Sequence, residues 1–322
     1  MSQYDVHTSL GRMYIILDLI VDIPIALQNR LTKAGIELAQ IITSWQKPVV
    51  TPYEVFFAYR KLFGLNKRLY LKSSIPEVSG CNRLRNKLVQ ARFLLSDENY
   101  HNRAYKIATE GASTADEVCC CVDPFCYVSH MSAMQRYGLT NRRPDALHLT
   151  RPDRETLKRL IKEKMIADYG GKIPNNTDEV MPLNSIGHSK IVRGRKVHVI
   201  HTKQFGENIR IRGTHTRAST IGQTFLDTLM EPQLCGGMSH VIEVWLDHAP
   251  MYQQEIIDTI NMSTSPISKL RAGYILEERL GIRHQAIDEW VKHAVRGSSR
   301  VLDPEKPFEQ NHSERWMLSI NV

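Results

Sequence analysis

Residues 82–107 read NRLRNKLVQARFLLSDENYHNRAYKI. In residues 82–92 the apolar side chains recur at helical spacing, and basic side chains fall on the opposite side. Two short apolar runs follow, 93–95 and 104–107, and the polar turn between them predicts a β-hairpin. The stretch therefore predicts a basic helix followed by a hairpin. The apolar side of the helix is formed by Leu84, Leu88, Val89 and Ala91, and the basic side by Arg83, Arg85, Lys87 and Arg92.

Two further helices are predicted before this stretch. Apolar residues recur at helical spacing over 25–45, and Pro24 is well placed near a helix start. Thr51 is expected to cap the next helix, with Pro52 in its first position. Helix, helix, basic helix and hairpin is the order of a winged helix-turn-helix. Residues 48–112 are therefore predicted to form such a domain.

Positive charge is concentrated in the same region. The chain has 42 Lys and Arg against 34 Asp and Glu, which gives a formal net charge of +8. Residues 60–106 hold eleven bases and three acids, so this segment alone carries the whole +8 and the rest of the chain is neutral. A basic surface on a neutral body fits a polyanion, because neutralised phosphates release counterions. Double-stranded DNA is the expected partner.

The basic residues are expected to act in three ways. Side chains of the 82–92 helix reach base edges in the major groove. Arg103 and Lys106 on the hairpin lie beside the minor groove or the backbone. The side chains expected to contact phosphates are those of Arg60, Lys61, Lys72 and Lys87. The alternative is a basic helix face that only meets solvent. The predicted DNA-binding residues are Arg60, Lys61, Lys72, Asn82, Arg83, Arg85, Asn86, Lys87, Arg92, Arg103 and Lys106.

The rest of the chain predicts a larger domain of mixed composition. An amphipathic helix over 154–166 and a strand over 196–203 precede a mostly helical region from 219 onward. The predicted fold class is α+β, with an N-terminal winged helix-turn-helix followed by a larger mixed α/β, mostly helical C-terminal domain. The predicted divisions are 1–47 for a helical extension that serves dimerisation or completes the DNA-binding domain, 48–112 for the winged helix-turn-helix, and 118–322 for the C-terminal domain.

The cysteines do not predict a metal site. Cys119, Cys120, Cys121, Cys126 and His130 lie close in sequence, but structural zinc sites usually show paired C-x2-C elements at two places in the chain. Reduced thiols, mostly buried, are the expected state. No metal and no cofactor are predicted.

The remaining motifs predict neither catalysis nor a membrane protein. The thirteen histidines form no HExxH or nucleophile-elbow pattern, and neither glycine pair, 170–171 or 236–237, is followed by the residues of a phosphate loop. Without an acid, a base and a nucleophile in one pattern, we expect a binding protein and not an enzyme. No stretch of 18 uncharged apolar residues and no signal peptide occur, so we expect a cytoplasmic protein without a membrane partner.

Two segments carry a family likeness. Residues 126–140 read CYVSHMSAMQRYGLT, and residues 220–237 read TIGQTFLDTLMEPQLCGG. Both segments, in this order and at this separation, resemble motifs of the AbiEi antitoxin family. The resemblance in sequence covers residues 115–290. In the basic block, residues 60–106, the resemblance is in the predicted order of helices and strands only.

The resemblance implies a bacterial or mobile-element regulator with a winged helix-turn-helix and a larger C-terminal domain. Such a protein would repress its own operon by binding inverted repeats as a homodimer or a cooperative pair. It would counteract a nucleotidyltransferase-like toxin encoded nearby, in a system that aborts phage infection. The alternative is a protein-interaction module, in which the C-terminal domain restrains a partner toxin and the basic block is incidental or binds RNA.

Overall fold

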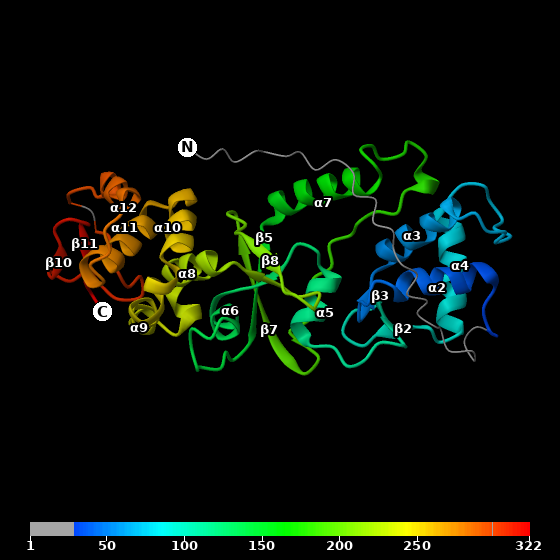
Figure 1. Cartoon of the computed structure of the whole chain (residues 1–322), viewed down its shortest axis with the longest axis horizontal. Coiled ribbons are helices and arrows are strands. Elements are labelled where there is room, and N and C mark those ends of the chain that lie inside the picture. Colours follow the sequence, from blue (N-terminus) through cyan, green and yellow to red (C-terminus); the bar gives the residue numbers. More distant parts are fainter. Residues whose placement is uncertain (1–28, 298) are drawn as a thin grey trace, which may run out of the picture.

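The computed structural model describes residues 29–297 and 299–322, and the fold is mixed α+β. Residues 1–28 of the predicted N-terminal extension lie outside the described residues. Figure 1 shows a group of helices and a small sheet at one end, a larger sheet in the middle and a second group of helices at the other end. None of the helices within the described residues combines the length and apolar character that a bilayer span requires.

The N-terminal body alternates helices with a small antiparallel sheet. Thr51 caps its second helix as predicted, because its hydroxyl accepts from the amide of Glu54 while the Glu54 carboxylate accepts from the amide of Thr51. The sheet order is β1-β3-β2, and β2 and β3 form the predicted hairpin. In chain order the elements are α2 (Lys33–Thr43), β1 (Val49–Val50), α3 (Pro52–Lys61), α4 (Val78–Gln90), β2 (Leu94–Asp97) and β3 (His101–Ile107).

Helix α2 belongs to this body and not to a separate extension. Leu38 and Ile42 of α2 are fully buried in one core with Phe56 of α3 and Leu88 of α4. The helix begins at Lys33, later than the apolar pattern predicts, because the Thr32 hydroxyl caps it by accepting from the amide of Gly35. The predicted boundary at residue 47 therefore divides a continuous core.

A long helix connects the middle sheet to the N-terminal body. Helix α7 (Arg154–Asp168) confirms the amphipathic helix predicted over 154–166, and Figure 1 shows it crossing between the two parts. At its end, the hydroxyl of Tyr53 donates to the carboxylate of Asp168 at 2.9 Å. Tyr169 and Met181, which follow α7, are buried in the N-terminal core. The chain thus returns to the first body after leaving it.

The middle of the molecule is a six-stranded mixed sheet. Its order is β6-β7-β5-β4-β9-β8, with parallel pairing of β5 to β7 and of β4 to β9. All six cysteines are buried and free, as expected, and four of them lie in the core beside this sheet. The elements are α5 (Ala115–Val122), β4 (Tyr127–Val128), α6 (His130–Arg136), β5 (Leu147–Pro152), β6 (Ile191–Val192), β7 (Arg195–Thr202), β8 (Asn208–Arg210) and β9 (Arg217–Ser219).

The C-terminal helices and the tail form a third core. Phe225 and Trp245 meet edge-on at its centre, and the tail returns to place Trp316 in the same core. The α-helices are α8 (Ile221–Met230), α9 (Met238–His248), α10 (Gln253–Met262), α11 (Pro266–Gly273), which continues as a π-helix over Tyr274–Arg279, and α12 (Gln285–Trp290); the tail adds β10 (His312–Ser313) and β11 (Leu318–Ser319).

Trp316 fixes the tail through a contact that only glycine permits. A methyl group at Gly273 would overlap the indole ring of Trp316, which is fully buried. We expect Gly273→Ala to lower the free energy of unfolding by about 1–3 kcal/mol, because the ring must shift in a packed core. Urea denaturation followed by tryptophan fluorescence measures this. Gly64→Ala, where nothing lies within 4 Å of the added carbon, is the control and should change little. An equal effect of both substitutions would contradict the assignment.

Candidate functional site

Helix α4 presents a basic face to solvent. Cys81, Leu84 and Leu88 are buried in the N-terminal core. Arg83 and Lys87 lie one turn apart on the opposite side, and both are exposed. Asn86, also exposed, lies between them on the same side. The helix predicted over 82–92 is therefore present with the predicted inner face, although it begins earlier, at Val78.

Two of the three acids in the basic segment form ion pairs with a base from outside it. Arg193 forms ion pairs with Asp97 at 2.5 Å and with Glu98 at 3.0 Å. Of the eleven bases in the segment, only Lys67 has an ion-pair partner among the described residues, the carboxylate of Glu37 at 2.7 Å. The positive charge of the segment is therefore largely uncompensated in the part of the chain that the structure describes.

Two of the predicted arginines pack against aromatic rings. The guanidinium of Arg60 lies 4.6 Å from the ring centre of Tyr169 and 5.4 Å from that of Phe57. Arg85 lies 5.7 Å from the ring centre of Tyr105. Both arginines are half-buried. These cation–π contacts turn Arg60 and Arg85 toward the protein and away from the open face that carries Arg83.

The turn of the hairpin is docked against the middle sheet. Besides the ion pair with Asp97, Arg193 donates from its backbone amide to the side-chain oxygen of Asn99 at 3.2 Å. The hydroxyl of Tyr100 lies 2.8 Å from Nδ1 of His188. These bonds occupy the tip that would otherwise enter a minor groove. Arg103 follows this tip, is exposed and lines the cleft described below, so its contact with DNA stays a prediction.

The predicted contact residues are spread over several parts of the molecule, and two of them lie at a cleft. Lys61 and Arg103 line a cleft of about 750 Å³ between the N-terminal body and the middle sheet. Trp45 and Arg210 also line this cleft, and the Lys61 ammonium lies 5.6 Å from the Trp45 ring centre. The other predicted residues lie outside the cleft lining: Arg83, Asn86 and Lys87 on the α4 face, Lys72, Arg92 and Lys106 exposed elsewhere, Asn82 half-buried, and Arg60 and Arg85 on the aromatic rings.

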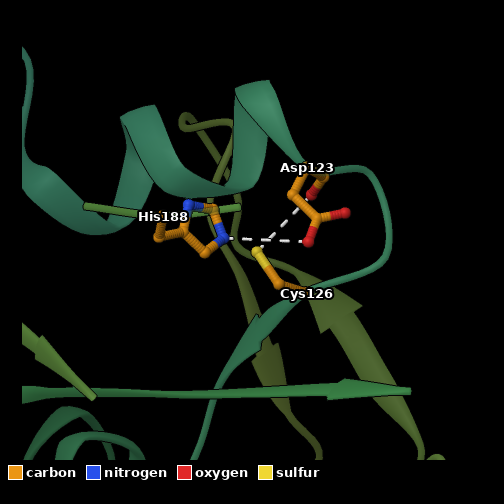
Figure 2. A group of neighbouring side chains, drawn as sticks. All are labelled: Asp123, Cys126 and His188. Carbon is orange, nitrogen blue, oxygen red and sulfur yellow. Dashed lines mark hydrogen bonds and ion pairs between the residues drawn. The ribbon is translucent and has the colours of Figure 1, made fainter. Parts of the chain in front are cut away.

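A buried polar cluster joins residues that are far apart in the sequence. Asp123 follows α5, Cys126 precedes β4, and His188 precedes β6. Figure 2 shows their side chains directed at one another, and one ligand-type atom from each lies within 4.8 Å of the other two. Of the cysteine and histidine group considered in the sequence, only Cys126 takes part. His188 could not be found from spacing, because the chain alone does not bring it to residue 126.

The second cavity contains a buried acid. Asp227 lines a cavity of about 430 Å³ together with His130 and Glu231. One carboxylate oxygen of Asp227 accepts from the Gln223 amide at 2.7 Å, and the other is buried without a hydrogen-bond partner. Burial is the main cause that raises the pKa of Asp227 to about 7, and the charge of Glu231 raises it further. In the sequence, only the spacing of Asp227 and Glu231, one helical turn apart, could have indicated that these two acids lie close together.

Ser129 and His130 pack beneath the same cavity. The Ser129 hydroxyl accepts from Thr150 at 2.8 Å and lies 2.9 Å from Nδ1 of His130, and it makes no capping bond to α6. Burial lowers the pKa of His130 to about 3, so the ring is neutral at ordinary pH. The two segments 126–140 and 220–237 meet here, because α6 packs against α8. Ser129 therefore occupies the N-cap position of α6, but its hydroxyl bonds within the core and does not cap the helix.

Comparison with known proteins leaves the family open. No protein-family model matches the chain, and no curated protein matches its sequence. Among solved structures, it is similar to the crystal structure of the RV2827C protein from Mycobacterium tuberculosis, with a TM-score of 0.44 and 11% sequence identity over 90% of this chain and 92% of that one. A likeness at this score carries no inference about function.

The pKa of Asp227 predicts a pH-dependent stability. The folded-state value of about 7 lies above the ordinary value of 3.8, so between these pH values the unfolded chain releases the proton first. Folding stability should therefore fall as pH rises from 4 to 7, by at most about 1.4 kcal/mol per pH unit. Asp227→Asn removes this loss and should be more stable than the unchanged protein at pH 8 but not at pH 4. Urea titrations of both proteins at pH 4 and pH 8 measure the free energy of unfolding and so test this difference.

The exposed Asp247 provides the control. Asp247→Asn should change stability little at either pH, because substitutions of exposed side chains usually alter the free energy of unfolding by less than about 0.5 kcal/mol. If Asp227→Asn also showed no difference between pH 4 and pH 8, the pKa of this carboxyl would be the same in the folded and unfolded chain, and the description of the cavity would be wrong.

Proposed function

We propose that the protein binds double-stranded DNA through helix α4 and acts as a transcriptional regulator. The observation that supports this most is the exposed basic face of α4, with Arg83 and Lys87 outside any ion pair in the described part of the chain. The N-terminal body also has the element order helix, strand, helix, helix, strand, strand, which is the order of a winged helix-turn-helix. In such domains the last helix enters the major groove.

The residue types on the α4 face suit base readout. An arginine can donate two hydrogen bonds to guanine, and an asparagine can pair with adenine in the same way. Arg83 and Asn86 offer these two chemistries on one exposed face, and Lys87 beside them suits a phosphate. Because the hairpin tip is bonded to Arg193, the proposed contact is carried by the helix and not by an inserted wing. This differs from the arrangement expected from sequence.

The proposed regulator represses its own operon at an inverted repeat. This part rests on the resemblance of residues 126–140 and 220–237 to the AbiEi family, which would also give the protein an antitoxin role. Most side chains of these segments contribute to cores: Met131 and Met134 of α6 pack with Phe225 and Leu229 of α8. These buried segments therefore support an architecture of the C-terminal part like that of the AbiEi family. The support for DNA binding comes from α4.

Removing the basic pair on α4 should weaken DNA binding. We expect the double substitution Arg83→Ala and Lys87→Ala to reduce affinity for a duplex from upstream of the protein's own coding sequence. Loss of one bidentate base contact costs about 1–3 kcal/mol, and loss of one phosphate contact lowers the slope of log K against log salt by about 1. Fluorescence anisotropy at several salt concentrations measures both quantities, and circular dichroism confirms that the variant is folded.

Helix α7 offers a matched control. Lys158 and Lys162 are exposed, lie one turn apart and have no ion-pair partner among the described residues. Lys158→Ala with Lys162→Ala removes the same net charge at another surface, so it should leave affinity and salt slope nearly unchanged. Equal losses in both double variants would show that net charge, and not the α4 face, determines binding. No loss in the α4 variant would exclude the proposed site.

A further inference from the structure

We propose that Asp123, Cys126 and His188 bind a zinc ion that ties the segment before β6 to the end of α5. The three side chains come from separate elements and meet in the interior beside the middle sheet (Figure 2). The side chain of His188 is fully buried and that of Asp123 is 2% exposed. Carboxylate, thiolate and imidazole are the three ligand types that zinc takes in proteins.

The separation of the atoms fits a shared metal better than a direct bond. Nε2 of His188 lies 3.7 Å from Oδ2 of Asp123, which is too long for a hydrogen bond. Two ligands at zinc bond lengths of about 2.0 Å in a tetrahedral arrangement lie roughly 3.3 Å apart, so a small movement closes the site. Nε2 of His188 has no hydrogen-bond partner in the described structure, although it is buried and directed into the cluster. A metal ion would give this atom a partner.

The surrounding residues hold the ligands as an outer shell does in zinc sites. The hydroxyl of Tyr100 lies 2.8 Å from Nδ1 of His188, which leaves Nε2 to face the cluster. Oδ1 of Asp123 accepts from the amide of Phe125 at 2.9 Å.

Arg151 is the charged group that a cation would meet. Its Nε lies 2.8 Å from Oδ2 of Asp123, and its Nη2 donates to the Ser185 hydroxyl at 2.7 Å. Nε of Arg151 and Oδ2 of Asp123 form an ion pair without the geometry of a hydrogen bond, so the lone pairs of Oδ2 remain available to a metal. Zinc would also convert the Cys126 thiol to a thiolate, and the two ligand charges would then neutralise the ion. The guanidinium therefore acts as an outer-shell partner of the carboxylate.

The proposal is tested on the full-length protein with zinc and cobalt. Protein purified by gel filtration should contain one zinc ion per chain by elemental mass spectrometry, and a metal-free sample should take up one on titration. Cobalt(II) bound in place of zinc should give the absorption bands of a tetrahedral thiolate site. Removal of zinc by a chelator should lower the thermal midpoint, because the ion links segments that are distant in sequence. These zinc, cobalt and chelator measurements are all made on the unchanged protein.

Variants then assign the ligands. Cys126→Ala and His188→Ala should each lose the bound zinc, and Cys126→Ala should lose the cobalt–thiolate band. Cys81→Ala is the control, because that thiol is buried in the N-terminal core, and it should retain both. A folded, unchanged protein that binds no zinc on titration would overturn the proposal. Zinc retained by both ligand variants, or a cobalt spectrum without a thiolate band, would do the same.

Discussion

The buried ion pair between Arg193 and Asp97 is the contact on which the arrangement of the N-terminal body and the middle sheet depends. The Asp97 side chain is fully buried and that of Arg193 is 15% exposed. Removing one partner of such a pair leaves an uncompensated charge in the interior, which costs about 3–5 kcal/mol. The same arginine holds the Asn99 side chain, and the Ser189 hydroxyl donates to the Asn99 carbonyl at 2.9 Å. The hairpin is thus part of the junction and not a free wing.

This junction determines which basic surface faces outward. With the hairpin tip occupied, Lys61 and Arg103 border a cleft between the bodies, while the α4 face with Arg83 and Lys87 remains open. Arg193 also neutralises two of the three acids in the basic segment, which raises the positive potential there. A single contact therefore orients the N-terminal body and increases the charge that it presents to an anionic partner.

Local structure could be predicted from sequence more fully than the junction could. Helical periodicity identified α4 and α7, and Thr51 with Pro52 predicted a helix start, because these signals involve residues within a few positions of one another. The packing of Arg60 on Tyr169 and the approach of His188 to Asp123 depend on how distant elements meet. No local pattern encodes such contacts, so charge alone could not place the Arg60 side chain on Tyr169 or Arg103 at the cleft, and the DNA contacts of both residues stay predictions.

The segment from 181 to 193 shows how this junction is built. It has little regular structure, yet side chains along its length contact three parts of the molecule: Met181 the N-terminal core, Ser185 the Arg151 guanidinium, and His188 both Tyr100 and the Asp123 cluster. A segment without helical bonds takes its conformation from such contacts. A zinc ion at His188 would add a fixed point midway along it and would stabilise the orientation of α4 relative to the middle sheet.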